Sequence, residues 1–396
     1  MPFRSVSAED ALTTASAEID RLGLEARATV VGTTARVALL RAGAQVAVGA
    51  GKGGGAQGTA SAYFEALERY LMSARDNRRW TADATRLLPA ATVAGQPALA
   101  ADLVVQRWAA EFPDSVAACA SYDGVRYPTF LADPRYYRWP VPGDDVQPYR
   151  SLLRYSSSLG TAAGVDVAEA VYHGLCELIE HDGLGQALLR WYVADNGDVD
   201  VVPAGTLPDD LRALHADAVR AAGAPVHLLD VTTDLGVPVY LAVSPATGAR
   251  TRLGAGASVW ATDAAARALG ELIQVCALSS SGGPAVRRRA AWPALQRCAL
   301  MPLGDLLAEA REVPLRADPD GDGSPGWGLD HARRALAGHG IGYHVCEVAP
   351  VGSLIAVATT IAPGLERFSL VQHGVPVLPT GRGWPLWPLP DVVAAG

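Results

Sequence analysis

The chain contains no arrangement of cysteines that would bind zinc or build a disulfide framework. Its five cysteines are scattered and include no CxxC pair, which predicts reduced thiols in an intracellular protein. No uncharged run is long enough to span a bilayer, and residues 1–10 lack a basic flank leading into an apolar stretch. We therefore expect a cytoplasmic protein with no membrane partner.

The chain also lacks an excess of positive charge. Its formal net charge is −8 with a pI near 5.5, so its long-range field repels nucleic acid, and we expect no nucleic-acid partner. Hydrophobic residues make up 49% and charged residues 19% of the chain, a balance typical of a globular protein. No linker divides the chain, which predicts one large domain or two lobes that share a core.

The common kinase signatures are absent as well. No GxxxxGK[ST] loop occurs, and neither HRD nor DFG is present, which excludes the common P-loop kinases and the protein kinases. No Ser/His/Asp set or activated cysteine stands out. A magnesium-dependent phosphotransferase of another type, acting on a small molecule, stays open as an alternative.

The feature that points to a chemical function is an acidic motif that occurs three times. In each copy an acid precedes a second acid or its amide by three positions, so that both side chains lie on one face of a helix. The three pairs are Glu65 with Glu68, Glu177 with Glu180, and Glu271 with Gln274. A single pair of this kind is usually a solvated helix face, but three of them indicate a shared site.

Each acidic pair follows a loop of small residues. These loops cover residues 49–58, 156–164 and 254–258, and their backbone N–H groups are suited to hold an anion. If the three helices converge, their carboxylates repel one another unless divalent cations lie between them. The pattern therefore predicts a site for magnesium and a nucleotide.

The periodicity predicts the elements that carry these pairs. We expect helices over residues 8–22, 58–76, 166–192 and 262–277, and paired strands over 27–48. Strand-like runs surround Val104 and Val116, and the proline-punctuated tail from Pro363 is expected to run extended over the surface. The proline- and aromatic-rich stretch 127–142 either presents a flat surface to a peptide or, as is more usual, packs as an ordinary surface loop.

Four motifs in the right order give the chain a resemblance to a known family. They are Gly51-Lys52-Gly53 followed by Ser61-x3-Glu65-x2-Glu68-Arg69, the serine-rich loop 157–164 before Glu177-x2-Glu180, Gly256-Ala257 before Arg267-x3-Glu271-x2-Gln274, and Pro363-Gly364-Leu365-Glu366. From about residue 45 to 385 the chain resembles the YcaO family. The resemblance implies an α/β (mixed α+β) fold, with mixed sheets and helices surrounding an ATP/Mg site.

The resemblance also implies a division of the chain and a type of reaction. Residues 1–44 would supply an N-terminal helix and first strand, 45–385 the catalytic domain, and 386–396 a proline-rich tail. Family members use ATP and Mg2+ to phosphorylate the oxygen of a peptide amide that a nucleophile has attacked. An azoline forms when the nucleophile is a Cys, Ser or Thr side chain, an amidine when it is an amine, and a thioamide when it is a sulfide donor.

By the same resemblance, each motif residue has an expected role. Glu68, Glu180 and Arg267 are expected to be catalytic. The five glutamates are the expected magnesium ligands, namely Glu65, Glu68, Glu177, Glu180 and Glu271. Gln274 supports this cluster, and Lys52 and Arg267 contact phosphate oxygens. Three further residues have alternatives: Ser61 bonds a phosphate or the nucleotide, Arg69 serves phosphate or pairs with an acid on its own helix, and His173 touches the nucleotide or is structural.

The chain departs from the family pattern at two positions, and its partners stay open. His181 follows Glu180 where an arginine is usual, which predicts a cation that titrates near neutrality, and Leu159 replaces a residue that is commonly polar. The departures leave open a non-catalytic relative that binds peptide or a partner protein. The expected partner is a precursor peptide, recognised directly or through a separate leader-binding protein, because only a short segment precedes Gly49. A homodimer also stays open.

Overall fold

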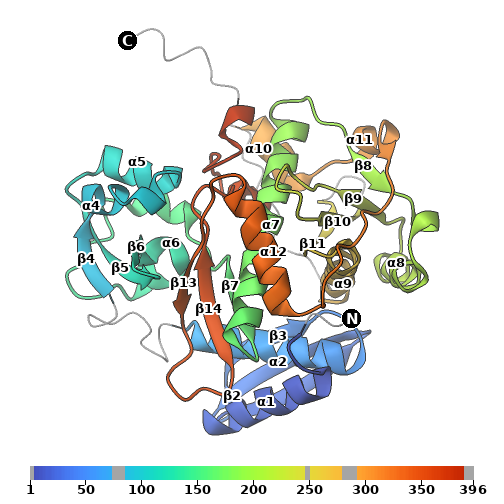
Figure 1. Ribbon diagram of the computed structural model, residues 1–396, viewed down its shortest axis with the longest axis horizontal. Coiled ribbons are helices and arrows are strands. Elements are labelled where there is room, and N and C mark those ends of the chain that lie inside the picture. The colour runs from blue at the N-terminus through green and yellow to red at the C-terminus, as the bar shows by residue number, and fades with distance from the viewer. Residues whose placement is uncertain (1–3, 74–84, 246–249, 279–291, 388–396) are drawn as a thin grey trace.

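The computed structural model of the 396-residue chain describes residues 4–73, 85–245, 250–278 and 292–387 (Figure 1). Within these ranges helices cover several small sheets, which confirms the expected mixed α and β architecture. The helices are α1 (Ala8–Arg21), α2 (Gly55–Leu71), α4 (Ala90–Ala94), α5 (Leu103–Glu111), α6 (Thr129–Ala132), α7 (Val167–Tyr192), α8 (Asp209–Ala222), α9 (Ala261–Leu278), α10 (Pro293–Leu300), α11 (Gly304–Ala308) and α12 (Pro325–Ala337). In this described part of the chain, no helix is long and apolar enough to cross a membrane.

The strands of the described residues form four sheets, and neighbouring strands are antiparallel except for β12 beside β8. The first sheet has the order β1 (Glu25–Val31), β2 (Thr34–Arg41), β3 (Ala44–Gly51). The second has the order β11 (Arg252–Ala257), β10 (Val239–Ser244), β9 (His227–Asp230), β8 (Asp200–Val202), β12 (Arg311–Glu312). The third is β13 (His344–Glu347), β14 (Ala356–Ile361), β7 (Thr161–Gly164), and the fourth is β4 (Thr85–Pro89), β5 (Val116–Tyr122), β6 (Val125–Pro128).

Helix α7 runs through the middle of the molecule, between the β7/β14 sheet and α12 (Figure 1). The Asp166 side chain caps its start by accepting a hydrogen bond from the Glu169 N–H at 2.8 Å, a typical N-cap. Most of its side chains are buried, so this helix belongs to the main core. Residues on α7 are therefore placed by packing on several sides.

Helix α2 lies unusually close to strand β3, because glycines face it. A Cβ atom added at Gly49 would lie 2.2 Å from the Ala62 carbonyl oxygen, and one at Gly51 would lie 1.6 Å from the Gly58 carbonyl oxygen. No real side chain tolerates such distances. Glycine at alternate positions of the strand thus lets its backbone touch the helix backbone.

The same arrangement places α9 on strand β11. Cβ atoms added at Gly254 and Gly256 would lie 2.3 Å from the carbonyl oxygens of Ala268 and Ala264, respectively. Helix α7 is equally close to the loop before it, because a Cβ atom added at its Gly174 would lie 2.3 Å from the carbonyl oxygen of Gly160. All three acidic helices therefore have direct backbone contact with the segment that precedes them.

Most of the expected elements are confirmed. The predicted helices correspond to α1, α2, α7 and α9, and the predicted strands at 27–48 to β1, β2 and β3, although residues 74–76 of the second predicted helix lie outside the described residues. The strand expected around Val104 is wrong, because that residue lies in α5. There the Asp102 side chain accepts from the N–H groups of Val104 and Val105, and Val104, Val105 and Trp108 are all buried, so burial outweighs the strand preference of valine.

The expectation of an extended surface tail from Pro363 is also wrong. Leu365, Glu366 and Phe368 are at most 4% exposed, and the turn Phe368–His373 packs against α7. The prolines that follow interrupt regular structure, but the segment up to Trp387 folds back on the core. Residues 388–396, most of the expected proline-rich tail, lie outside the described residues.

Replacing Gly256 by alanine is expected to destabilise the protein by about 2 kcal/mol or more, because the added methyl group forces β11 away from α9. Gly205, which has open space around its Cβ position and no positive φ, supplies the control Gly205→Ala, expected to change stability by less than about 0.5 kcal/mol. Urea unfolding of both variants measures the difference. Equal stabilities would contradict the close helix-strand contact.

Candidate active site

The three acidic pairs lie on α2, α7 and α9, and the structure brings these helices together around the end of β3. The Lys52 ammonium, just after β3, forms an ion pair with Glu271 on α9 at 2.6 Å. The Gln274 side-chain amide, also on α9, donates to the Ala50 carbonyl oxygen of β3 at 3.1 Å. Helix α9 and the first glycine loop are thereby joined at one place.

Glu65 on α2 is fixed against the same strand. Its carboxylate accepts a hydrogen bond from the Ala50 N–H at 2.7 Å and pairs with Arg69 one turn later. The Arg69 guanidinium also donates to the Val48 carbonyl oxygen at 2.8 Å. Of the two alternatives for Arg69, the structure contains the pair with an acid on its own helix, and a contact to phosphate stays a prediction.

Glu177 on α7 has an equivalent contact with its own glycine loop. The Gly160 N–H donates to its carboxylate at 2.9 Å. A backbone N–H thus meets the first acid of the pair on α2 and on α7. Each of these two loops directs one N–H group at a carboxylate, which makes the loops suitable for an anion.

The remaining carboxyls show how closely the acids gather. Burial, together with the neighbouring Glu271 carboxylate, raises the pKa of Glu177 to about 7 and that of Glu180 to about 8. Burial also raises the pKa of Glu68 well above its ordinary value, with added repulsion from Glu177 and Glu65. Acids from all three helices therefore sense one another.

Two cations lie among these acids. Partial burial lowers the pKa of Lys52, but the Glu271 and Glu180 carboxylates more than compensate and raise it above its ordinary value. Burial also lowers the pKa of Arg267, but its ion pair with Asp263 more than compensates and raises this pKa above its ordinary value. Asp263 lies one turn earlier on α9, 2.7 Å from the guanidinium. Both side chains stay charged, and Lys52 keeps 40% of its side chain exposed.

Two further predicted residues lie on the acidic helices, each one turn before the first acid of a pair. Ser61 lies on α2 one turn before Glu65, and its side chain is half-buried. His173 lies on α7 one turn before Glu177, with its ring centroid 6.0 Å from that of Tyr172. Their roles toward a nucleotide stay predictions.

The carboxylate and amide oxygens of the site fit a magnesium ion that is bound together with a phosphate. Across the described ranges, no three His, Cys, Asp or Glu side chains meet closely enough to form a metal cage by themselves. Mg2+ prefers one or two carboxylates together with substrate phosphates and water. The buried Gln274 side-chain oxygen has no hydrogen-bond donor within the part of the chain that the structure describes, as expected where a ligand completes the site.

His181 does not act as the expected cation. Burial lowers its pKa to about 3, and the nearby His373 and Lys52 lower it as well. Its Nδ1 lies 2.7 Å from the Ser369 hydroxyl. The expectation of a side chain that titrates near neutrality is wrong, because this position faces the packed C-terminal segment, where a charge would be costly.

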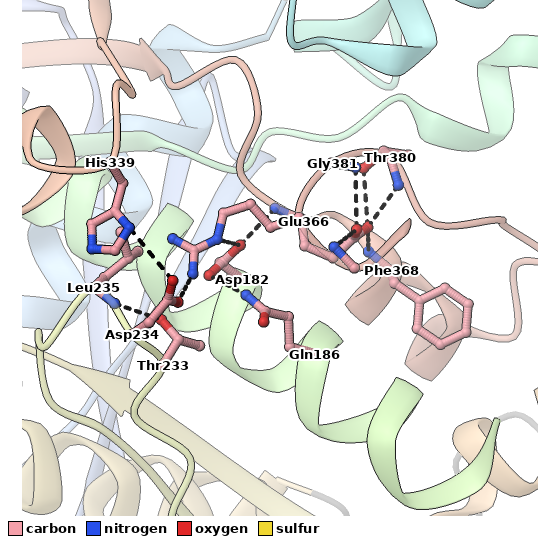
Figure 2. Close-up of polar contacts among 12 residues, drawn as sticks. Asp182, Gln186, Thr233, Asp234, Leu235, His339, Glu366, Phe368, Thr380 and Gly381 are labelled. Carbon is pink, nitrogen blue, oxygen red and sulfur yellow. Dashed lines mark hydrogen bonds and ion pairs between the residues drawn. The ribbon is translucent and has the colours of Figure 1, made fainter. Parts of the chain in front are cut away.

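A buried network behind the acidic pair of α7 was not expected from the sequence (Figure 2). Asp182, two residues after Glu180, accepts hydrogen bonds from the Glu366 N–H at 2.9 Å and from Gln186 at 2.8 Å. Arg382 lies 3.8 Å from Asp182 and also pairs with Asp234. The network ties the helix that carries Glu180 to the C-terminal segment.

Glu366 organises that segment. Its two carboxylate oxygens accept from a group of backbone N–H donors, those of Arg367, Phe368, Thr380, Gly381 and Gly383, and from the Thr380 hydroxyl (Figure 2). Such a buried carboxylate is stabilised only by many donors at once. The Pro363-Gly364-Leu365-Glu366 motif marked the position, but the periodicity gave no sign of these partners, since they come from up to 17 residues away.

A second unexpected contact involves the N-terminus. The Arg4 guanidinium pairs with Glu169, near the start of α7, at 3.1 Å and lies over the Phe64 ring of α2 at 5.2 Å. Burial lowers the pKa of Arg4, and nearby Arg267 lowers it too. The segment before α1 thus links two of the acidic helices.

With this geometry described, comparison with known proteins is informative. A family model described as YcaO cyclodehydratase, ATP- and Mg2+-binding, matches residues 50–366. The chain belongs to the YcaO family. Its members bind ATP and Mg2+, as the resemblance of the motifs led us to expect.

Relatives support the fold of this YcaO protein. A YcaO structure from Methanopyrus kandleri, bound with AMPPCP and Mg2+, is similar with a TM-score of 0.65 at 19% identity, covering 95% of this chain and 96% of the other. A heterocyclase in complex with substrate and cofactor also gives 0.65 at 18% identity, covering 91% of this chain and 53% of the other. An uncharacterized protein in the tfuA 3′ region of Rhizobium leguminosarum bv. trifolii is 35% identical over 105 residues, which is 26% of this chain and only 24% of that protein.

The Glu366 network is expected to contribute strongly to stability. Glu366→Gln replaces one acceptor oxygen by a donor that faces N–H groups, and leaving buried donors unsatisfied should cost about 2 kcal/mol or more. The matched change at exposed Glu309, Glu309→Gln, should cost less than about 0.5 kcal/mol. Denaturant unfolding measures both, and a Glu366 variant as stable as the control would refute the importance of the network.

The acidic cluster is expected to destabilise the protein in the absence of magnesium and nucleotide. Since the folded-state pKa of Glu180 is about 8, above the ordinary value of an unfolded chain, its contribution to stability falls as pH rises from about 4.5 to 8. Glu180→Gln should therefore raise the melting temperature of the EDTA-treated protein, and more at pH 8.5 than at pH 5.5. Differential scanning fluorimetry checks this, and a lower melting temperature at both pH values would be the contrary result.

Proposed function

We propose that the protein is an ATP- and Mg2+-dependent peptide cyclodehydratase that acts on a ribosomally made precursor peptide. The observation that carries the proposal is the gathering of carboxyls from three helices, with raised pKa values, around Lys52 and two glycine loops. Such a cluster is costly without a polycationic partner, and Mg2+ carrying a nucleotide phosphate satisfies it. Membership of the YcaO family supports the same ligand.

In the proposed reaction the phosphoryl group of ATP makes the amide oxygen a leaving group, so that the peptide loses one water in total while ATP becomes ADP and phosphate. Glu65, Glu68, Glu177, Glu180 and Glu271 would hold magnesium. Lys52 and Arg267 would neutralise phosphate oxygens, and Gln274 would complete the site with its side-chain oxygen. In phosphoryl transfer such positioning and charge neutralisation provide most of the catalysis.

The three buried thiols of the chain are consistent with a nucleophile that comes from the substrate. Burial raises the pKa of Cys119, Cys176 and Cys298 to about 12 each, so these thiols are poor nucleophiles. A Cys, Ser or Thr of the peptide would then give an azoline, and an amine of the peptide a macrocyclic amidine. A thioamide would require a separate sulfide donor and remains the second alternative.

A non-catalytic relative that binds peptide or a partner protein is the other alternative. The retention of all five glutamates speaks against it, because clustered negative charge has no benefit without a cation to hold. His181 shares a hydrogen bond with Ser369 of the C-terminal segment, which leaves Lys52 and Arg267 as the cations of the proposed site. The catalytic proposal therefore accounts for more of the site.

Glu68→Gln and Glu180→Gln are expected to lower peptide-dependent ATP turnover at least about 100-fold while leaving the fold intact, since each removes a carboxylate from the proposed magnesium site. Calorimetric titration with ATP and Mg2+ should show binding by the native protein and by the control Glu309→Gln. Binding should be at least about 10-fold weaker in the two site variants. Full activity in either variant would overturn the site assignment.

Binding in the native protein also directs the search for the substrate. Candidate peptides incubated with the enzyme, ATP and Mg2+ should lose the mass of one water, as read by mass spectrometry. A peptide that instead exchanges oxygen for sulfur in the presence of a sulfide source would move the conclusion to the thioamide alternative. Native protein that binds no nucleotide, with or without peptide, would favour the non-catalytic relative.

A further inference from the structure

An exposed aromatic surface lies between α6 and the second glycine loop. Residues 133–155 form an irregular segment with two short turns, Tyr136–Arg138 and Arg150–Tyr155. Tyr137 and Trp139 are 45% and 46% exposed. Two adjacent large aromatics in water indicate a contact surface more often than a packing defect.

The segment is held in place from beneath. The buried Asp144 carboxylate accepts hydrogen bonds from the Ala118 N–H of β5 at 2.8 Å, from the Tyr136 hydroxyl at 2.6 Å and from the Tyr149 hydroxyl. Tyr136 and Tyr149 are both fully buried. Since the backbone around Tyr137 and Trp139 is fixed by these contacts, the exposed rings are available to a ligand at little cost in entropy.

A groove runs beside the Tyr137 ring, two residues before Trp139 in the chain. Its lining residues come from both turns and the chain between them, and they are Tyr137, Val146, Gln147, Arg150 and Leu153. The exposed Leu87 of β4 borders the same segment, because its side chain lies against Gly143. The groove therefore offers apolar and aromatic walls, and we call it the arginine groove for the charges described next.

Three exposed arginines lie on the segment that forms the arginine groove, and its exposed acid is Asp145, which accepts a hydrogen bond from the Gln147 N–H. Arg135, Arg138 and Arg150 are exposed, and within the described ranges none of the three forms an ion pair with a carboxylate. By contrast, the exposed Arg212 and Arg220 on α8 each pair with an aspartate. On a protein with a net charge of −8, a local group of unpaired guanidinium ions fits an acidic partner.

The segment that lines the groove is followed along the chain by the second glycine loop. The turn Arg150–Tyr155 continues into Ser157, whose N–H donates to the Leu131 carbonyl oxygen at 3.1 Å. Three residues later, the Gly160 N–H contacts Glu177. The segment that forms the groove is thus continuous along the chain with the loop that contacts the acidic cluster.

We propose that the arginine groove binds an acidic segment of the peptide substrate, one that carries aromatic or aliphatic side chains and is separate from the residue that reacts. Its carboxylates pair with Arg135, Arg138 and Arg150, and its apolar side chains pack on Tyr137 and Trp139. This rests on the proposed function, and it makes recognition of the peptide a property of this chain itself. The groove would hold the substrate while the acidic cluster activates the amide.

Fluorescence anisotropy with two labelled probes tests the proposal. The acidic probe is a 12-residue peptide with three repeats of Glu-Asp-Leu-Phe, and the basic probe replaces both acids by lysine, each about 12 residues long to span a typical groove. The full-length protein should bind the acidic probe at least about 10-fold more tightly, and added salt should weaken the binding. Equal affinity for both probes, or no binding of the acidic one, would overturn the proposal.

Variants locate the binding. The double variant Arg138→Glu/Arg150→Glu and the single variant Trp139→Ala should each weaken binding of the acidic probe about 10-fold or more. The control Arg212→Glu/Arg220→Glu makes the same change of charge on α8, far from α6 (Figure 1), and should leave the binding within about 2-fold. Equal losses in the control and groove variants would overturn the proposal.

Two further readouts separate this proposal from its alternatives. Calorimetry with ATP and Mg2+ should give the same nucleotide affinity for native protein and groove variants, so that lost peptide binding with intact nucleotide binding isolates the groove. Native protein that binds the acidic probe through the groove but binds no nucleotide would refute the proposed function alone. A Trp139→Ala protein that changes from dimer to monomer by light scattering would show that a second copy of the chain occupies the groove, which contradicts the proposal.

Discussion

Direct contact between glycine-bearing backbone and three helices is the constraint on which the rest of the structure depends. At Gly49, Gly51, Gly254 and Gly256, any side chain would collide with a carbonyl oxygen of α2 or α9. Gly160 and Gly174 give α7 the same closeness to its loop. Because the helix and the preceding strand touch, the backbone N–H groups at the end of the strand meet the first acid of the helix, as Ala50 meets Glu65. A looser packing would leave these acids in water.

The same constraint buries several carboxyl groups close together, which destabilises their charged forms. Burial and neighbouring acids raise the pKa values of Glu68, Glu177 and Glu180, and Lys52 balances only part of the charge. The protein tolerates this because the helices are fixed by packing elsewhere, above all through α7 in the main core and through Asp182 and Glu366 behind it. Stability provided far from the site thus maintains a site that favours a cation and phosphate.

Sequence reasoning succeeded where the signal is local. The helix expected over residues 8–22, which Ser7 caps by accepting from the Asp10 N–H at 3.1 Å, and the spacing of the acidic pairs both depend on residues close in the sequence. It failed where distant residues decide: Val104 lies in a helix because its neighbours bury it, His181 is uncharged because the C-terminal segment covers it, and that segment is buried because Glu366 collects its N–H groups. The partners of Glu366 are separated from it by loops whose path no periodicity reveals.

The amino-acid sequence by itself determined the three acidic helices, the glycine loops before them, the mixed α and β class and the family, because each follows from short spacings and from motifs in a fixed order. Only the tertiary structure decided that Lys52 meets Glu271, that Arg69 turns to its own helix and that Tyr137 and Trp139 are exposed while Tyr136 and Tyr149 are buried. The physical reason is that side-chain charge, burial and partners depend on which segments pack together, and packing joins residues more than 200 positions apart, as it does for Lys52 and Glu271.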